Sequence, residues 1–290
     1  MDYVKPQDIA DCMVAAGASK VSLPTKDLLI RGALAGAYLG VATSMAVGAT
    51  LQTGQPIVGA LVFPFGLCLV ILLGTELITG SFALLPCATV AGKQGAGLGP
   101  VLRNWGWVFL GNLLGSVAYG ALLAIALTMS GAGDIAPAGK KLVEMAQAKT
   151  TGYAAYGMAG MITVFTKAIL CNWLVSLAVV MAFSATSVVG KIVAMWGPVT
   201  LFFSQGFEHS VVNMFVIPIG MMMGANVSLQ DWWLWNQLPV TAGNLIGGLV
   251  FTGLALYLSH RPQPVKETRT IDRLPEPELV SATATVATAR

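Results

Sequence analysis

Six long apolar stretches alternate with short polar segments along the chain, near residues 28–50, 57–91, 104–129, 157–183, 192–224 and 237–259. A helix needs about 20 mostly apolar residues to cross a hydrocarbon core of about 30 Å, and each stretch reaches that length. The pattern therefore predicts an all-α membrane protein with six transmembrane helices.

The second and fifth stretches differ from the others, because each is too long for one span and is interrupted by polar residues. The interruptions read G-T-E-L-I-T-G-S from Gly74 to Ser81 and S-Q-G-F-E-H-S from Ser204 to Ser210. Irregular backbone at membrane depth is tolerated only where protein buries it or where it lines a cavity. We predict that helices 2 and 5 are broken.

Two features recur at one offset in the two halves of the chain. Glu76 and Glu208 are 132 positions apart, and so are the G-N-L-x-G strings that begin at Gly111 and Gly243. The shared offset indicates duplication of a three-span unit. An odd number of spans puts the two copies in opposite orientations, and paired broken helices in such inverted repeats form a permeation site near the midplane.

The composition agrees with a membrane protein and excludes an ordinary soluble one. Charged residues make up 10% of the chain, against about 25% in soluble domains. The four Cys and two His show no metal-ligand spacing, so we expect no disulfide scaffold, metal or cofactor. The net charge of +3 is too small to indicate a nucleic-acid partner.

The basic residues indicate the orientation of the spans. Of the 16 Lys and Arg residues, 12 fall on the side that carries both termini and three on the opposite side; Lys167 lies within the fourth span. Cytoplasmic loops are enriched in Lys and Arg, so we expect both termini in the cytoplasm. We divide the chain into an amphipathic N-terminal segment (1–27), a six-span domain (28–260) and a disordered tail (261–290).

Ionisable side chains inside a bilayer are costly and by default mark a functional pathway. At the predicted membrane depth they are Glu76, Lys167, Glu208 and His209. The two glutamates lie in the helix breaks, where they either cap exposed backbone N–H groups or take part in transport. Lys167 either concentrates small anions on the outer approach or pairs with one of these glutamates.

His209 is the only histidine in the predicted transmembrane region, and histidine titrates near neutral pH. In the second break it can donate a hydrogen bond to an anion or pass it a proton, which removes the charge that the bilayer centre penalises most. A satisfied core histidine is the alternative. Neutral amides come from three further spans, as Asn112, Asn172 and Asn244.

Four motifs resemble those of the formate/nitrite transporter family. They are Gly206–Met214 (G-F-E-H-S-x-x-N-M), Leu170–Val175 (L-C-N-W-L-V), Leu34–Tyr38 (L-A-G-A-Y) and Gly243–Gly248 (G-N-L-I-G-G), and the match covers about residues 20–260 in the family's order. The resemblance implies an aquaporin-like fold, a homopentamer with one pore per subunit in a bacterial or archaeal inner membrane, and selectivity for small monovalent anions. It also implies gating by the N-terminal helix.

The resemblance further implies a substrate pathway and two constrictions. It makes His209 the central pore residue with Thr79 and Asn172 as polar partners, and we add Lys167, Glu208 and Asn244 to the pathway. Phe63, Leu67 and Val175 match an outer hydrophobic constriction, and Leu77 and Phe202 an inner one. Apolar constrictions gate by excluding water, which stops bare ions.

Several functions remain to be weighed. We expect a formate channel, with nitrite or hydrosulfide as alternatives within the same family. A water or glycerol channel normally needs two Asn-Pro-Ala turns, and this sequence has none. An intramembrane enzyme is disfavoured, because the chain has no H-E-x-x-H pair, no G-x-S-x-G elbow and no cofactor loop.

Overall fold

The computed structural model describes residues 2–261, and within that range the fold is helical with no named β-strand. The expected disordered tail lies outside the described residues, apart from Arg261. In the part of the chain that the structure describes, four helices are long and apolar enough to cross a membrane: Thr25–Thr53, Leu98–Leu127, Gly157–Ser184 and Leu229–His260.

The first three long helices are α2 (Thr25–Thr53), α6 (Leu98–Leu127) and α9 (Gly157–Met181), the last extended by the 3₁₀ turn η2 (Ala182–Ser184). The fourth is continuous but contains two π-helical segments. Its parts are α12 (Leu229–Trp232), η3 (Trp233–Gln237), α13 (Leu238–Ile246), η4 (Gly247–Leu254) and α14 (Ala255–His260).

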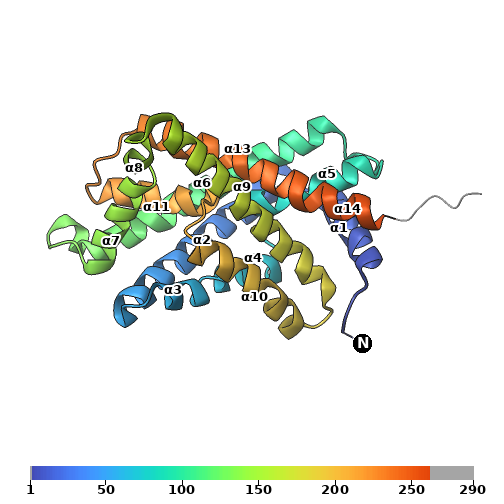
Figure 1. Ribbon diagram of the computed structural model, residues 1–290, viewed down its shortest axis with the longest axis horizontal. Helices are drawn as coiled ribbons and strands as arrows, with labels where there is room; N and C mark the ends of the chain where they lie inside the picture. The colour runs from blue at the N-terminus through green and yellow to red at the C-terminus, as the bar shows by residue number, and fades with distance from the viewer. Residues whose placement is uncertain (1, 262–290) are drawn as a thin grey trace, which may run out of the picture.

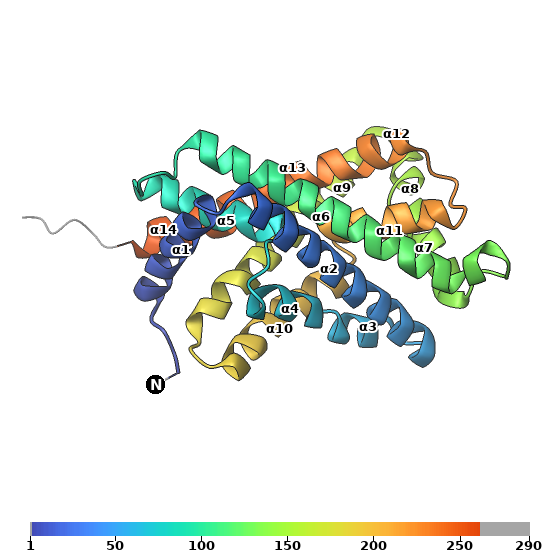
Figure 2. The ribbon, with the colours of Figure 1, turned by 180° about the vertical axis from the view of Figure 1, so that it is seen from behind.

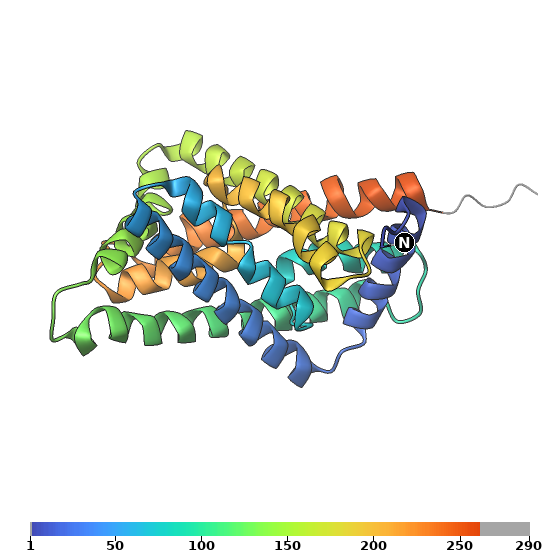
Figure 3. The ribbon, with the colours of Figure 1, turned by 90° about the horizontal axis from the view of Figure 1, so that it is seen from below.

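Shorter apolar helices pack against the long ones. They are α3 (Pro56–Val62), α4 (Phe65–Leu72), α5 (Ile78–Val90), α10 (Val188–Ser204) and α11 (Ser210–Met222). Non-helical residues 73–77 separate α4 from α5, and residues 205–209 separate α10 from α11. Seen from below, α3, α4 and α10 lie in front of the long helices (Figure 3).

The remaining helices lie at the two ends of the long axis. The α1 helix (Pro6–Val21) lies near α14 at one end, and α7 (Pro137–Ala148) and α8 (Thr151–Ala154) lie at the other (Figures 1 and 2). We call these the α1 end and the α7 end. The 3₁₀ turn η1 (Met129–Gly131) precedes α7. The apolar pattern did not predict α7 and α8, because they are short and lie in a polar connection.

Close approach of backbones holds α2 against α6. A Cβ on Gly115 would overlap the carbonyl oxygen of Ala33, and one on Gly36 would overlap that of Asn112. The α9 helix and the last long helix approach in the same way, because a Cβ on Gly247 would overlap the carbonyl oxygen of Ile169. Small residues let membrane helices pack this closely.

Candidate functional site

Asn112 of α6 closes the interruption before α5. Its Oδ1 accepts the backbone N–H of Ile78 at 3.0 Å, and its Nδ2 donates to the carbonyl oxygens of Glu76 and Gly32, both at 2.8 Å. The backbone N–H of Glu76 donates to the Arg31 carbonyl of α2 at 3.2 Å. These bonds satisfy the N–H and carbonyl of Glu76 and the N–H of Ile78, which no helix pairs.

Asn244 of α13 closes the interruption before α11 in the same way. Its Oδ1 accepts the N–H of Ser210 at 2.8 Å, and its Nδ2 donates to the carbonyls of Glu208 at 2.9 Å and Ala168 at 2.8 Å. The backbone N–H of Glu208 donates to the Lys167 carbonyl of α9 at 3.4 Å. Asn244 was expected in the pathway, but its amide oxygen and both amide hydrogens bind backbone groups.

Each buried glutamate forms an ion pair with a lysine from outside its own helix pair. Lys20 of α1 lies 2.8 Å from both carboxylate oxygens of Glu76, and Lys149 lies 2.8 Å from Oε2 of Glu208. The glutamate side chains are 4% and 2% exposed. The alternative in which Lys167 pairs with one of these glutamates is wrong, because among the described residues each glutamate pairs with a different lysine. The Lys167 ammonium lies 5.7 Å from the centroid of the Tyr153 ring.

Further hydrogen bonds surround Glu208. The Tyr153 hydroxyl donates to Oε1 at 2.8 Å, and the Asn213 amide donates to Oε2 at 2.8 Å. The Asn236 Nδ2 donates to Oε2 at 3.4 Å and to the backbone carbonyl oxygen of Lys149 at 2.9 Å. A buried charge that is paired and hydrogen-bonded on every side is held in place rather than free to move.

His209 lies at the N-cap of α11, and its hydrogen bonds fix the tautomer of its ring. Nδ1 accepts the backbone N–H of Val212 at 3.2 Å, and Nε2 lies 3.0 Å from the hydroxyl of Thr79. A backbone N–H can only donate, so Nδ1 carries no proton and the neutral ring carries it on Nε2. The Thr79 hydroxyl then accepts that proton and its own hydrogen is free to donate.

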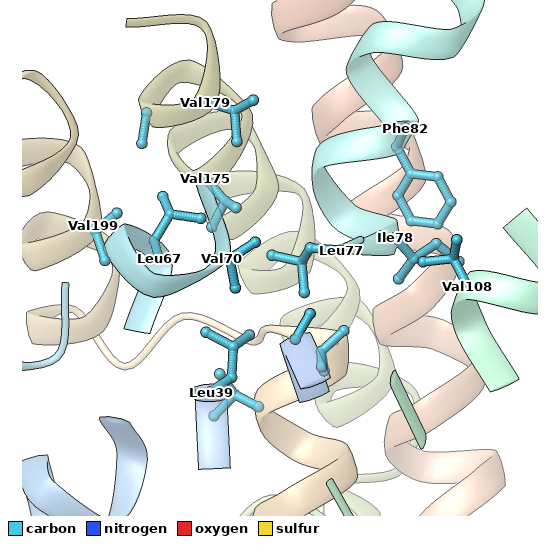
Figure 4. Packing of buried hydrophobic residues seen from close by; sticks show 14 of the residues in the cluster. Leu39, Leu67, Val70, Leu77, Ile78, Phe82, Val108, Val175, Val179 and Val199 are labelled. Atoms are coloured by element: carbon cyan, nitrogen blue, oxygen red, sulfur yellow. The ribbon is translucent and has the colours of Figure 1, made fainter. Parts of the chain in front are cut away.

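The apolar residues expected at the constrictions line one small cavity with His209. The cavity is lined by Leu39, Phe63, Leu67, Leu77, Val175, Val199, Phe202 and His209, and its volume is about 10 Å³. Leu67, Val175 and Leu77 come from α4, α9 and the segment before α5 (Figure 4). A space of this size holds about one water molecule.

The structure groups these side chains differently from the expected outer and inner sets. Phe63 and Phe202, placed at opposite constrictions by the resemblance, are in edge-to-face contact with ring centroids 5.7 Å apart. Phe202 also stacks on the His209 ring at 5.8 Å. Leu67 and Leu77, likewise assigned to different sets, both line the neighbouring pocket at the α1 end.

Asn172 does not line the small cavity. Its Nδ2 donates to the backbone carbonyls of Thr79 at 3.1 Å and Asn244 at 2.6 Å, and the Ser176 hydroxyl reaches the same Thr79 carbonyl at 3.4 Å. These bonds attach α9 to the first turn of α5. Asn172 therefore positions Thr79 opposite His209 through its backbone.

A larger pocket that contains lysines lies at the α7 end of the molecule, and another lies at the α1 end. The pocket at the α7 end has a volume of about 590 Å³ and contains Lys149, Lys167 and Glu208. The pocket at the α1 end has a volume of about 260 Å³ and contains Lys20, Lys191 and Glu76. Lys20 and Lys149 are the site residues that the sequence did not single out. Their only signal was that two buried glutamates each need a cation.

The family model described as "Formate/nitrite transporter" matches residues 7–258. The chain belongs to the formate/nitrite transporter family. It is 35% identical to the "Probable formate transporter" of Methanothermobacter thermautotrophicus, over 89% of this chain and 97% of that protein. It is also 35% identical to "Nitrite transporter NirC" of Salmonella typhimurium, over 82% of this chain and 86% of that protein.

Among solved structures, this family member resembles a "Pentameric formate channel with formate bound". The TM-score is 0.65 at 30% sequence identity, and the match covers 81% of this chain and 97% of the other. The family consists of membrane transporters, in agreement with the four helices long enough to cross a bilayer.

Proposed function

We propose that this protein is a homopentameric membrane channel for small monovalent anions, with formate as its principal solute. The observation that carries the proposal is the pairing of His209 with Thr79 at the wall of a cavity otherwise lined by apolar side chains. The solved relative that is named as a pentameric formate channel supports both the solute and the assembly.

The proposal takes the membrane domain as six spans in two inverted three-helix repeats. In the first repeat α2, the broken helix α3/α4–α5 and α6 are the spans; in the second they are α9, the broken helix α10–α11 and the last long helix. The matching hydrogen bonds of Asn112 and Asn244 support this division. Both termini then face the cytoplasm, and the α7 end faces outward.

The charge pattern suits the entry and dehydration of an anion. Lysines in the two end pockets raise the local concentration of anions by electrostatic attraction. The apolar side chains between them exclude water, so an anion has to lose its hydration shell to pass. The Nε2–H of His209 and the Thr79 hydroxyl are the polar groups that replace part of that shell.

Proton transfer lowers the remaining barrier. A charge at the bilayer centre is strongly penalised, whereas neutral formic acid is not. The resting ring is neutral and its N–H is far too weak an acid to protonate formate, so the ring first takes up a proton from water on the side from which formate enters. The imidazolium then gives a proton to a carboxylate oxygen, which leaves the ring neutral and the solute as formic acid. Net movement is then that of the acid. The acid releases the proton again after passage and no covalent bond to carbon changes, so the proposed role is transport and not catalysis.

Nitrite is the second candidate, because a relative named as a nitrite transporter has the same 35% identity to this chain, over a shorter match, as one named for formate. Nitrite and hydrosulfide are also small and monovalent, and the same cavity wall presents the same groups to each of them.

The deciding experiment measures formate and nitrite flux into proteoliposomes at pH 7 and pH 5, with an internal pH probe. Faster formate entry at pH 5 with internal acidification supports movement of the neutral acid past His209. Nitrite flux that carries charge without acidification would instead establish an electrogenic nitrite channel and reject formate as the principal solute.

A further inference from the structure

The pocket at the α7 end is far larger than the solute proposed for the pore. Its volume is about 590 Å³, whereas the cavity at His209 measures about 10 Å³. A formate ion has three heavy atoms, so most of the pocket is more than its passage requires. Pockets of about 300–1,000 Å³ are the usual size for drug-sized ligands.

The charges in this pocket sum to one positive charge. Its charged lining residues are Lys149, Lys167 and Glu208. Lys149 and Glu208 neutralise each other in an ion pair at 2.8 Å, so Lys167 is the cation whose charge no carboxylate balances among the described residues. A single net positive charge matches a ligand with one negative charge.

The remaining wall of the pocket is aromatic and apolar. Tyr153 and Tyr156 contribute rings, and Met145 contributes a thioether. The Tyr156 side chain is 75% exposed, so its ring is available to a ligand. The Tyr153 ring lies beside the Lys167 ammonium, which brings the cation and the aromatic wall together. Aromatic and thioether side chains pack favourably against a ligand ring.

From the size, charge and wall of this pocket, we propose that it is a binding site for bulky monovalent aromatic carboxylates, which bind at Lys167 and block the entrance without passing through. The carboxylate contacts the Lys167 ammonium, and the ring packs on Tyr156 and Met145. A benzoate ion has nine heavy atoms, so the apolar cavity beyond excludes it. The blocking step rests on the proposed function; the binding step does not.

Benzoate binding to the full-length protein, measured by titration calorimetry in detergent, tests the site directly. We expect benzoate to bind, neutral benzamide to bind more weakly because it lacks the charge, and acetate to bind more weakly because it lacks the ring. Lys167→Met should weaken benzoate binding about tenfold or more, since a charged hydrogen bond is lost. Lys167→Arg should restore most of the affinity.

The matched control is Lys140→Met, which removes an exposed lysine of α7 outside this pocket. It should leave the affinity for benzoate unchanged. If Lys167→Met does not fold, Tyr156→Ala serves as a second variant, and it should weaken benzoate more than acetate. Equal benzoate affinity in the wild type, Lys167→Met and Tyr156→Ala would overturn the proposal.

Formate flux tests the blocking step. Benzoate should slow formate entry from the α7 side and not from the α1 side. For each variant, the rate of formate entry with benzoate is compared with the rate of the same variant without it. Benzoate that crosses the membrane as fast as formate would overturn the block. A wild-type protein that binds benzoate through Lys167 but moves neither formate nor nitrite would reject the proposed function and keep the binding site.

Discussion

Asn112 and Asn244, 132 positions apart, make the same three kinds of hydrogen bond, each closing one helix interruption against a long helix. Both side chains are fully buried. The two interruptions are thus rigid, hydrogen-bonded features, and the polar groups that they present at the centre of the fold are held in fixed positions.

The buried asparagines should matter more for stability than for solute contact. Asn244→Ala leaves the Glu208 carbonyl and the Ser210 N–H buried without this partner, and each unsatisfied group costs about 1–3 kcal/mol. We expect a large fall in the thermal midpoint in detergent, and a similar fall for Asn112→Ala. The exposed Asn226→Ala is the control and should have little effect. An unchanged midpoint in Asn244→Ala would contradict this role.

Replacing only Lys149 of the ion pair with Glu208 should lower the stability of the protein more than replacing both residues. Lys149→Met leaves a carboxylate that is 2% exposed without its cation, which costs about 3–5 kcal/mol. Adding Glu208→Gln to Lys149→Met should recover part of that loss. Thermal unfolding of the single and double variants measures the difference. Lys141→Met, which breaks the exposed pair with Glu144, is the control and should change the midpoint little.

His209→Asn should keep the fold and alter the pH dependence of transport. Asparagine is a favourable N-cap residue, so its side chain can replace Nδ1 as acceptor for the Val212 N–H. Its amide neither takes up nor releases a proton. We therefore expect pentamers with formate flux that varies much less between pH 7 and pH 5. A flux with unaltered pH dependence would reject His209 as the proton donor.

The contact between Phe63 and Phe202 should restrict what passes His209. Phe202→Ala removes a ring that is 3% exposed and enlarges the small cavity, at a cost of about 3–5 kcal/mol in stability. We expect faster water permeation and measurable entry of acetate, followed by light scattering in proteoliposomes. Leu201→Ala, the neighbouring exposed position, should leave both unchanged. Equal acetate exclusion in both variants would argue against a constriction at Phe202.

Asp2 attaches the N-terminal segment to the start of α10, and this tether should weaken in acid. Its carboxylate accepts hydrogen bonds from the hydroxyls and backbone N–H groups of Ser187 and Thr186 at 2.6–2.8 Å. These bonds, led by that of the Ser187 hydroxyl, hold the pKa of Asp2 well below its ordinary value of 3.8. The stabilisation is therefore full above that value and is lost as the pH falls towards the folded-state pKa.

Hydrogen exchange in the first residues of the chain measures this tether. Protection should be constant from pH 7 to pH 5, after correction for the intrinsic rate, and should fall below about pH 4. Asp2→Asn should remove much of the protection at pH 7, whereas the exposed Asp11→Asn should not. Equal protection in Asp2→Asn and the wild type would show that the carboxylate does not hold the segment.

The sequence by itself determined the class of protein, the family and the position of the helix interruptions. Apolar length and the scarcity of charge are local properties, so they identify membrane helices without knowledge of their packing. The string around His209 and the repeated G-N-L-x-G motif pointed to the residues that the structure brings to the centre. The amphipathic start of the chain likewise predicted a helix where α1 lies.

Only the tertiary structure decided which groups meet. Lys20 and Glu76 are 56 positions apart, and Lys149 and Glu208 are 59 apart, so no periodicity links them. Lys167 was the cation that the sequence placed at membrane depth, yet the crossing of the helices brings it beside Tyr153. The contact of Phe63 with Phe202 and the inward backbone bonds of Asn172 depend on the same crossing. Side-chain partners across helices follow from three-dimensional packing, which a one-dimensional pattern does not contain.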